Sequence, residues 1–242
     1  MIDIPQVIDV ESQLTKRAMQ SFGTPPLALH DTSLEDEIFA HALAVLNSVE
    51  SSPSQSIALE LSNLESLVHD RDFGLKIVHS QSMEQLLVLA RESSMHEIRQ
   101  GAARVIGSSL WNNPEATNAL RGSNLVTKLI DALKREQHNR VQASLIFALS
   151  AAVHVVDGLQ EYLNANGFQV LRDLFTRDQS NVQIKCASFV EDNLPSNRNI
   201  PGVNQELTEW CYVFQECLMR RPCDVVSEKA LSSLMSCFVC LC

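Results

Sequence analysis

The sequence predicts an all-α fold, a superhelical array of about four helical repeats with helical N- and C-terminal caps. The first observation is a recurring helical pattern, in which Ile98 has a counterpart 43 residues later at Val141 and another 41 residues further on at Val182. The second is that the helix expected to open at Leu125 returns 43 residues later at Phe168. The third is that no segment alternates apolar and polar residues as a half-buried strand does.

The length of the repeat narrows the architecture. Helical units of about 40–47 residues are typical of armadillo and HEAT arrays, in which each unit buries its apolar face against its neighbours. We therefore expect an armadillo-like repeat domain over residues 56–242. Residues 1–55 are expected to form an acidic N-terminal segment with short helices.

The N-terminal segment has weak periodicity. Residues 12–22 can form a short helix that Gly23-Thr-Pro-Pro26 ends, because paired prolines cannot continue a helix. Thr32, with Glu35 three residues later, resembles an N-cap and its carboxylate, so a helix is expected over 35–47. The serine-rich residues 51–56 are expected to form a loop.

The helical units follow this loop. The first unit is expected to contain a helix at 58–68, a turn and short helix at 69–77 and a helix at 83–91. Two full units are expected at 98–136 and 141–178. Further helices are expected at 182–190, 207–219 and 227–242, with a break at Pro195 and a loop at 196–204. The first unit is the least regular, as terminal repeats are, because one of its faces lacks a neighbour. Gly167 is expected to take a left-handed conformation at a helix C-terminus.

Composition and charge exclude several classes of protein. The chain is 45% hydrophobic and 20% charged, so it can bury a core. Its net charge is −10, and residues 1–60 hold nine acids against two bases. This balance leaves no basic stripe for nucleic acid. No run of 18 or more apolar residues occurs, so no membrane insertion is expected.

Both ends of the chain also carry predictions. The N-terminus lacks the basic and apolar regions of a signal peptide. The C-terminal residues 237–242 continue an apolar helical pattern, with no retention signal, and Val239 stands where a prenylation box needs cysteine. An uncapped apolar end indicates that structure continues, so we expect the chain to be truncated at its C-terminus.

All seven cysteines lie between Cys186 and Cys242. Cys237-x-x-Cys240 has no second cysteine or histidine pair to complete a tetrahedral zinc set, and no βαβ context for a redox motif. Buried helical cysteines that pack as small hydrophobes are the favoured interpretation. A redox pair stays an alternative, and no cofactor or metal is expected.

The repeat register locates a candidate groove. In armadillo arrays the third helix of each unit lines the concave face, and importin-type members place a Trp and, four residues later, an Asn there to grip an extended basic peptide. The corresponding pairs are Arg104 and Ser108, Phe147 and Ala151, and Ser188 and Asp192. Because the Trp and Asn ladder is absent, an import receptor is disfavoured. A mixed polar and apolar groove for a folded partner is predicted instead.

Several motifs resemble a different armadillo family. Ile98-Arg-x-x-Ala-Ala-Arg-Val-Ile-Gly107 followed by Asn112-Asn-Pro114, together with Phe147-Ala-Leu-Ser150 and Asn166-Gly-Phe168, resembles nucleotide exchange factors of the 70-kDa heat-shock chaperones. Val68-His-Asp-x-x-x-Gly-x-Lys-Ile77 and Leu207-Thr-Glu-Trp-x-x-x-Phe-Gln-Glu-x-Leu218 are similar to the endoplasmic-reticulum (SIL-type) branch, which serves BiP. The resemblance spans roughly residues 55–235.

The resemblance implies a co-chaperone with roles in protein folding, protein transport and translocation. The curved array would embrace lobe II of the chaperone's ATPase domain, tilt it away from lobe I and release ADP. Such a factor binds the open conformer more tightly than the closed, ADP-bound one, and so lowers ADP affinity reciprocally. The family also implies the endoplasmic-reticulum lumen, whereas a complete chain without a signal peptide would be cytoplasmic. A monomer is expected.

Candidate contacts come from the groove and from the His-Asp turn. The expected partner-binding residues are His69, Asp70, Lys76, Arg104, Ser108, Asn112 and Phe147. Arg is favoured at interface anchors, so Arg104 is the leading candidate, with a salt bridge inside the array as its alternative. Phe147 is either an anchor or, as favoured, packing between units. His69 and Asp70 either bind the partner or cap the next helix.

Other residues have structural explanations that are favoured over contact. Asn112 and Asn113 are expected to satisfy backbone groups at the helix end before Pro114. Lys76 is otherwise a solvated charge, and Trp111 is expected in the core.

An enzyme is not expected, because the sequence has no histidine pair at i, i+4, no phosphate loop and no serine elbow. The remaining alternatives are a generic armadillo scaffold for an unrelated partner and an exchange factor of the cytosolic branch.

Overall fold

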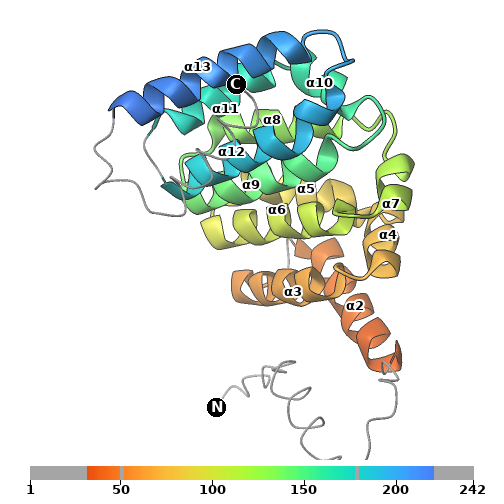
Figure 1. Ribbon diagram of the computed structural model, residues 1–242. Coiled ribbons are helices and arrows are strands. Elements are labelled where there is room, and N and C mark those ends of the chain that lie inside the picture. The colour runs from red at the N-terminus through yellow and green to blue at the C-terminus, as the bar shows by residue number, and fades with distance from the viewer. Residues whose placement is uncertain (1–31, 50–51, 178–179, 221–242) are drawn as a thin grey trace, which may run out of the picture.

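The computed structural model describes residues 32–49, 52–177 and 180–220. Over these ranges the chain is all-α and contains no strand, as predicted (Figure 1). The elements are α2 (Thr32–Asn47), α3 (Ser54–Leu67), α4 (Arg71–His79), α5 (Ser82–Glu92), α6 (His96–Leu110), α7 (Pro114–Ala119), α8 (Leu125–Arg135), α9 (Asn139–Ala152), α10 (Gly158–Asn164), α11 (Gly167–Phe175), α12 (Ser180–Asn193), the 3-10 helix η2 (Pro195–Asn197) and α13 (Val203–Arg220).

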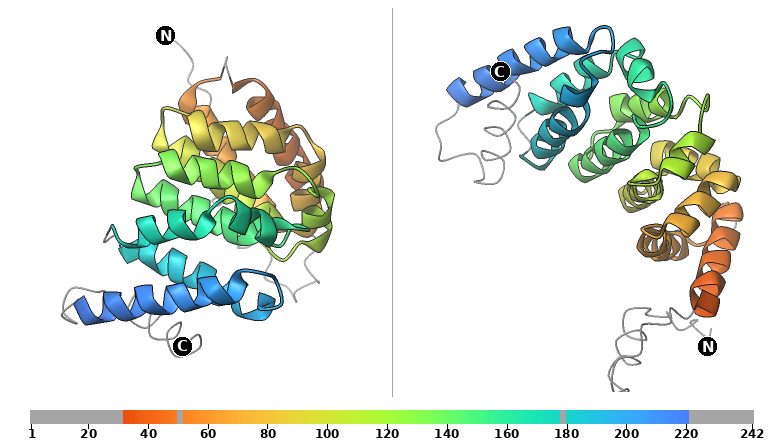
Figure 2. Two further views of the ribbon diagram at one scale, coloured as in Figure 1. Left: turned by 90° about the horizontal axis from the view of Figure 1, so that it is seen from above. Right: turned by 45° about the vertical axis from the view of Figure 1, so that its right-hand side comes forward.

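The helices form repeated units of one short and two longer helices. The units are α4–α5–α6, α7–α8–α9 and α10–α11–α12, with α2–α3 before them and α13 after them. We call α3, α6, α9 and α12 the third helices; they pack side by side in that order. Figure 2 shows that the array curves into an arc, with the third helices along its inner side.

The third helices bury apolar residues against several neighbouring helices. α6 packs against α3, α5 and α9, so Ala102, Ala103 and Ile106 are fully buried. α8 has fewer neighbours and is amphipathic, with its buried residues on one stripe and Lys134 and Arg135 in its last turn. Cations at a helix C-terminus interact favourably with the helix dipole.

Several turns between helices use residues in the left-handed conformation, and four of those in the described ranges are not glycine. Asn112, Asn124, Asp157 and Asn166 all have φ between 54° and 66°, a conformation that Asn and Asp tolerate best among non-glycine residues. The prediction for Gly167 is therefore wrong, because Asn166 takes the left-handed conformation before α11.

Gly167 has a different role, which concerns packing. It is the first residue of α11, and the ring of Tyr162 lies directly against its Cα. A Cβ there would stand 2.1 Å from Cε2 of Tyr162, so only glycine leaves room for the fully buried ring.

The N-terminal helix packs on the array. Phe39, Ala42 and Leu46 of α2 belong to the same core cluster as the third helices. α3 begins at Ser54, so the predicted loop over 51–56 is wrong at its last three residues. The division at residue 55 stays a prediction. The helices predicted at 12–22 and 227–242, the Cys237-x-x-Cys240 motif and the apolar C-terminal end lie outside the described residues.

Polar side chains join successive units. Arg99 of α6 donates to both carboxylate oxygens of Glu136, at 2.6 and 3.0 Å, and Glu136 also accepts from the backbone N–H of His138 and Gln137. Burial acts to raise the pKa of Glu136, but the hydrogen bonds and the charge of Arg99 outweigh it and hold the pKa below its usual value. In the next pair of units, Asn193 donates to Ser150 at 2.9 Å.

No helix in the described ranges is long and apolar enough to cross a membrane.

Candidate partner-binding surface

The inner side of the arc presents Arg104 to solvent. Its side chain is 49% exposed and its Nη2 lies 2.5 Å from Oε1 of Glu65 on α3. The salt bridge inside the array, the alternative raised by the sequence, therefore exists. Since about half of the guanidinium-bearing side chain remains accessible, a role in partner binding stays a prediction.

Ser108, four residues after Arg104, is 3% exposed. The serine therefore lies beneath the surface rather than in an open groove. A partner approaching α6 can therefore reach Arg104 but has little access to Ser108.

Phe147 packs between units and remains partly exposed. Its ring lies over Gly107 of α6, where a Cβ would stand 2.5 Å from Cε1 of Phe147. The ring centroids of Phe147 and Trp111 are 5.8 Å apart, and Lys185 Nζ of α12 lies 5.6 Å from the Phe147 centroid. Three consecutive third helices therefore contribute to one strip of aromatic and basic side chains.

Trp111 corrects an expectation from the sequence. We predicted it in the core, but Trp111 is the first residue after α6 and is 42% exposed. A signal was present in the sequence, because Trp111 lies two helical turns after Arg104 and so on the same face.

The His-Asp turn forms an open hollow at one end of the array. A hollow of about 670 Å³ brings together three of the predicted residues, His69, Asp70 and Lys76, with residues of α2 and α4. Asp70 caps α4 by accepting from the N–H of Asp72 at 2.8 Å, as one of its two interpretations predicted. Lys76 lies 2.7 Å from Asp36 Oδ1 and 4.5 Å above the ring of Phe73, so it is a paired charge rather than a merely solvated one.

At the Asn112-Asn-Pro114 break, Asn113 satisfies backbone groups as the sequence predicted. Asn113 caps α7 by accepting from the N–H of Ala116, and its amide donates to the backbone oxygens of Arg71 and Ser109. The carbonyl of Asn112 accepts from Arg71 Nε at 3.1 Å while the residue itself is exposed. These contacts tie the break to α4 of the preceding unit, and any contact of Asn112 with a partner stays a prediction.

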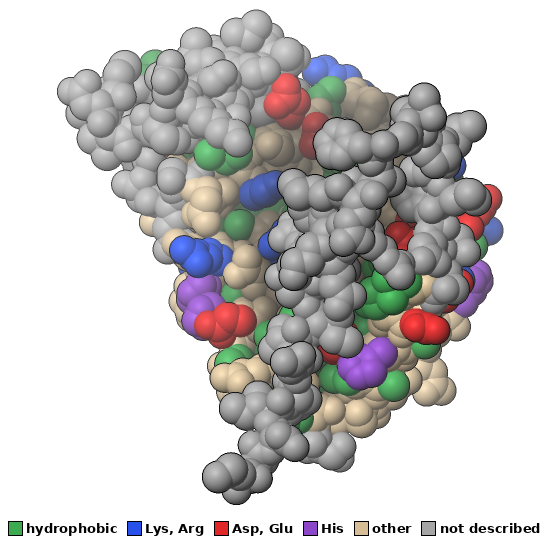
Figure 3. Space-filling view, turned by 90° about the horizontal axis from the view of Figure 1, so that it is seen from below, with side chains coloured by type: hydrophobic (Ala, Val, Ile, Leu, Met, Phe, Trp, Pro, Cys, Tyr) green, Lys and Arg blue, Asp and Glu red, His purple; other side chains and the backbone are tan. Residues whose placement is uncertain are grey.

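The charges on the surface are mixed. In the space-filling view of Figure 3, acidic, basic and hydrophobic side chains lie next to one another on the described part of that side of the molecule. On α12, burial and the neighbouring Glu191 raise the pKa of Asp192, while His154 and Lys185 act against the shift. Such a surface suits a folded protein partner better than a polyanion.

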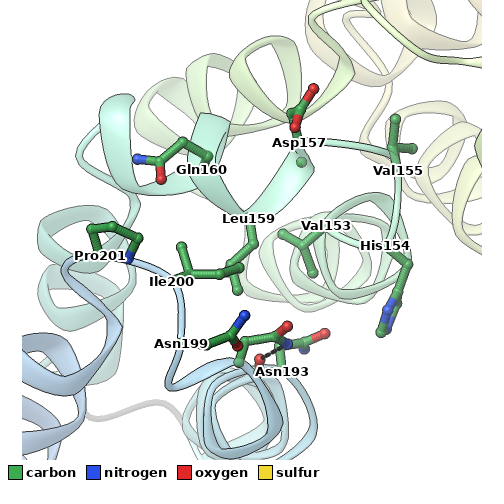
Figure 4. A pocket seen from close by; sticks show the side chains of 12 residues that line it. Val153, His154, Val155, Asp157, Leu159, Gln160, Asn193, Asn199, Ile200 and Pro201 are labelled. Atoms are coloured by element: carbon green, nitrogen blue, oxygen red, sulfur yellow. Dashed lines mark hydrogen bonds between the residues drawn. The ribbon is translucent and has the colours of Figure 1, made fainter.

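A second hollow of about 470 Å³ lies at the edge of the array, between the ends of α9 and α12 (Figure 4). Its walls combine apolar residues such as Leu159 and Ile200 with the amides of Asn193 and Asn199. Asn193 is 1% exposed, and its Oδ1 has no hydrogen-bond partner among the described residues.

A buried acid lies where α10 and α13 meet. Glu206 of α13 is 5% exposed, and its Oε1 accepts from the hydroxyl of Tyr162 at 2.7 Å and from Nε1 of Trp210 at 3.4 Å. Burial raises the pKa of Glu206 to about 7, although both hydrogen bonds act to lower it. Both hydrogen-bond partners belong to the chain itself, so the raised pKa of Glu206 bears on the stability of the fold.

The described residues contain no cluster of three or more His, Cys, Asp or Glu that could hold a metal ion. Cys186 is fully buried, and burial raises the pKa of its thiol, as expected of a cysteine that packs as a small hydrophobe. Cys211 on α13 is disulfide-bonded, so this interpretation does not hold for every cysteine.

Comparison with known families identifies one match over most of the chain. The model of the family described as nucleotide exchange factor SIL1 matches residues 35–236. This range includes every helix from α3 to α13.

Curated relatives agree. The chain is 29% identical over 175 residues to the nucleotide exchange factor SIL1 of Candida albicans, covering 67% of this chain and 42% of that protein. It is 25% identical over 215 residues to an uncharacterised protein of Schizosaccharomyces pombe, covering 80% of this chain and 62% of that protein. The chain thus spans less than two thirds of the length of these relatives.

Among solved structures, a designed armadillo repeat protein in complex with the peptide (KR)4 superposes with a TM-score of 0.65 at 13% identity, covering 85% of this chain and 83% of that chain. At this identity the likeness shows the fold alone, and it confirms the prediction of an armadillo-like array.

Proposed function

Because the chain belongs to the SIL1 nucleotide exchange factor family, whose members are non-enzymatic co-chaperones, we propose that it binds the ATPase domain of a BiP-type 70-kDa chaperone and promotes ADP release. The observation that carries the proposal is the family match over residues 35–236. We further propose that it acts as a monomer in the endoplasmic-reticulum lumen, in protein folding and translocation, as the family resemblance implies.

The curved array supports a mechanism by differential binding. A rigid arc that contacts the open ATPase domain more extensively than the closed one shifts the population toward the open conformer. By linkage, the factor then lowers the affinity of the chaperone for ADP by the same ratio as ADP lowers the affinity of the chaperone for the factor. No group on the protein needs to react with the nucleotide.

The proposed contact surface comprises the exposed side of the third helices and the hollow at the His-Asp turn. Arg104 and Phe147 represent the first, and His69, Asp70 and Lys76 the second. Arg104 is the residue to test, because Arg is enriched among interface residues that dominate affinity.

The experiment measures release of a fluorescent ADP from BiP and from a panel of cytosolic 70-kDa chaperones, with and without the protein. Acceleration with BiP supports the proposal, whereas acceleration only with cytosolic chaperones favours the cytosolic branch. If a demonstrably folded chain accelerates none of them, the exchange-factor proposal is wrong and a scaffold for another partner takes its place.

A variant pair tests the surface. Arg104→Glu places a second carboxylate beside Glu65 and should weaken chaperone binding by about 10-fold or more. Glu65→Gln removes the internal ion pair but keeps the arginine, so affinity should be retained. Equal affinities of both variants and the unmodified chain would place the contact elsewhere.

A further inference from the structure

Trp111 is an exposed aromatic residue that directly follows α6, one of the third helices. Four large hydrophobic residues of the described ranges are exposed, and the others are Val88, Tyr212 and Met219. Tryptophan is the residue type most enriched among interface anchors, and a half-exposed indole leaves much apolar area for a partner to cover.

Contacts within the chain hold the backbone of Trp111 and support one side of its ring. The backbone N–H of Trp111 donates to the carbonyl of Gly107 at 3.0 Å, which holds the residue at the end of α6. Its ring is inclined by 38° to the ring of Phe147 at a centroid distance of 5.8 Å. An aromatic ring held by a second ring loses little conformational freedom when a partner binds, and this pre-organisation favours affinity.

The strip has a defined chemical character. Lys185 Nζ lies above the Phe147 ring at 5.6 Å, and Arg104 stands on the same side of α6 as Trp111. Asp192 lies near enough to Lys185 for its pKa to be affected. The aromatic pair with a flanking ammonium group is complementary to an apolar side chain flanked by a carboxylate.

We propose that Trp111, supported by Phe147 and flanked by Lys185, is an anchor of the chaperone interface, where it covers an apolar side chain next to an acidic residue on the ATPase domain. The inference rests on the proposed function. The strip is continuous with the proposed surface, because Phe147 belongs to both and Trp111 directly follows α6, the helix that carries Arg104.

The test labels the two tryptophans of the chain with 5-fluorotryptophan and records ¹⁹F spectra with and without the unlabelled ATPase domain. The chain contains Trp111, which is exposed, and Trp210, which is fully buried, so Trp111→Phe assigns both resonances. Free Trp111 should show a solvent isotope shift between H₂O and D₂O. In the complex its resonance should move and lose this shift, while the resonance of Trp210 stays unchanged.

Binding measurements complete the test. Trp111→Ala should weaken binding by about 30-fold, as truncation of an interface anchor does. Tyr212→Ala removes another exposed aromatic side chain, on α13, and should leave affinity within about 2-fold. Circular dichroism confirms that each variant is folded.

The outcomes separate the inference from the proposed function. If ADP release accelerates and the Trp111 resonance keeps its position and isotope shift, the exchange function stands and the anchor is wrong. If free Trp111 shows no isotope shift, the ring is already covered by other residues of the chain and the anchor is again wrong. If neither ADP release nor the spectrum responds to the chaperone, the proposed function itself fails.

Discussion

Because the carboxyl of Glu206 is buried, we expect the free energy of unfolding of this protein to decrease as the pH rises from mildly acidic to mildly basic values. Burial raises the pKa of Glu206 from its ordinary value of about 4.5 to about 7 in the folded chain. A raised pKa of an acid means that the folded state prefers the neutral form. The stabilisation is therefore fully present below about pH 4.5 and is lost as the pH rises through about 7.

The magnitude follows from the shift. One pKa unit corresponds to about 1.4 kcal/mol, so the rise from about 4.5 to about 7 corresponds to about 3 kcal/mol of folding free energy between pH 4.5 and 8. Glu206→Gln removes the titration but keeps an oxygen that can accept from the hydroxyl of Tyr162. The variant should gain stability relative to the unmodified chain at pH 8 and gain none at pH 4.5.

The assay is urea unfolding followed by circular dichroism at 222 nm from pH 4.5 to 8. The free energy of unfolding of the unmodified chain should lose about 3 kcal/mol more than that of Glu206→Gln over this range. Glu115→Gln, at an exposed position of α7, is the matched control and should follow the unmodified chain. Parallel pH profiles for Glu206→Gln and the unmodified chain would refute the reasoning.

Three further substitutions test the packing. Gly167→Ala drives a methyl group into the buried Tyr162 ring and should lower the free energy of unfolding by about 1–3 kcal/mol or more. In the control Gly101→Ala, the added Cβ would stand 3.1 Å from its nearest side-chain neighbour, so the loss should be smaller. Equal unfolding midpoints of the two variants would contradict this. Asn193→Asp buries a carboxylate in place of an amide that donates two hydrogen bonds, and should lower the free energy of unfolding by about 3 kcal/mol. The control Asn199→Asp changes an exposed residue and should leave the free energy of unfolding nearly unchanged in the same assay. Arg99→Met leaves its buried carboxylate partner uncompensated, and thermal unfolding should show a loss of about 3 kcal/mol that shrinks as that carboxylate is protonated at low pH.

Much of the architecture could be predicted because helical repeats are encoded locally. The helix predicted to open at Leu125 agrees with the start of α8, and the break before Pro114 lies where the sequence places it. Helix period, proline and N-cap residues act over a few positions, so they can be read without knowing the neighbours.

The candidate surface was predicted less completely. The register brought Arg104 and Phe147 to the inner side of the arc, and the structure shows both at least partly exposed. It also assigned Ser108 to the groove, although that residue is buried, and placed Trp111 in the core, although that residue is exposed.

The sequence by itself determined the helices, their period and the family resemblance, because each depends on residues that are close along the chain. The tertiary structure alone decided which side chains on one helical face reach solvent. That outcome depends on how closely the next unit approaches: Phe147 occupies the space above Gly107, between units, and the indole of Trp111 lies beside it with 42% of the residue exposed. Likewise, only the meeting of α10 and α13 surrounds Glu206 with Tyr162 and Trp210 and raises its pKa.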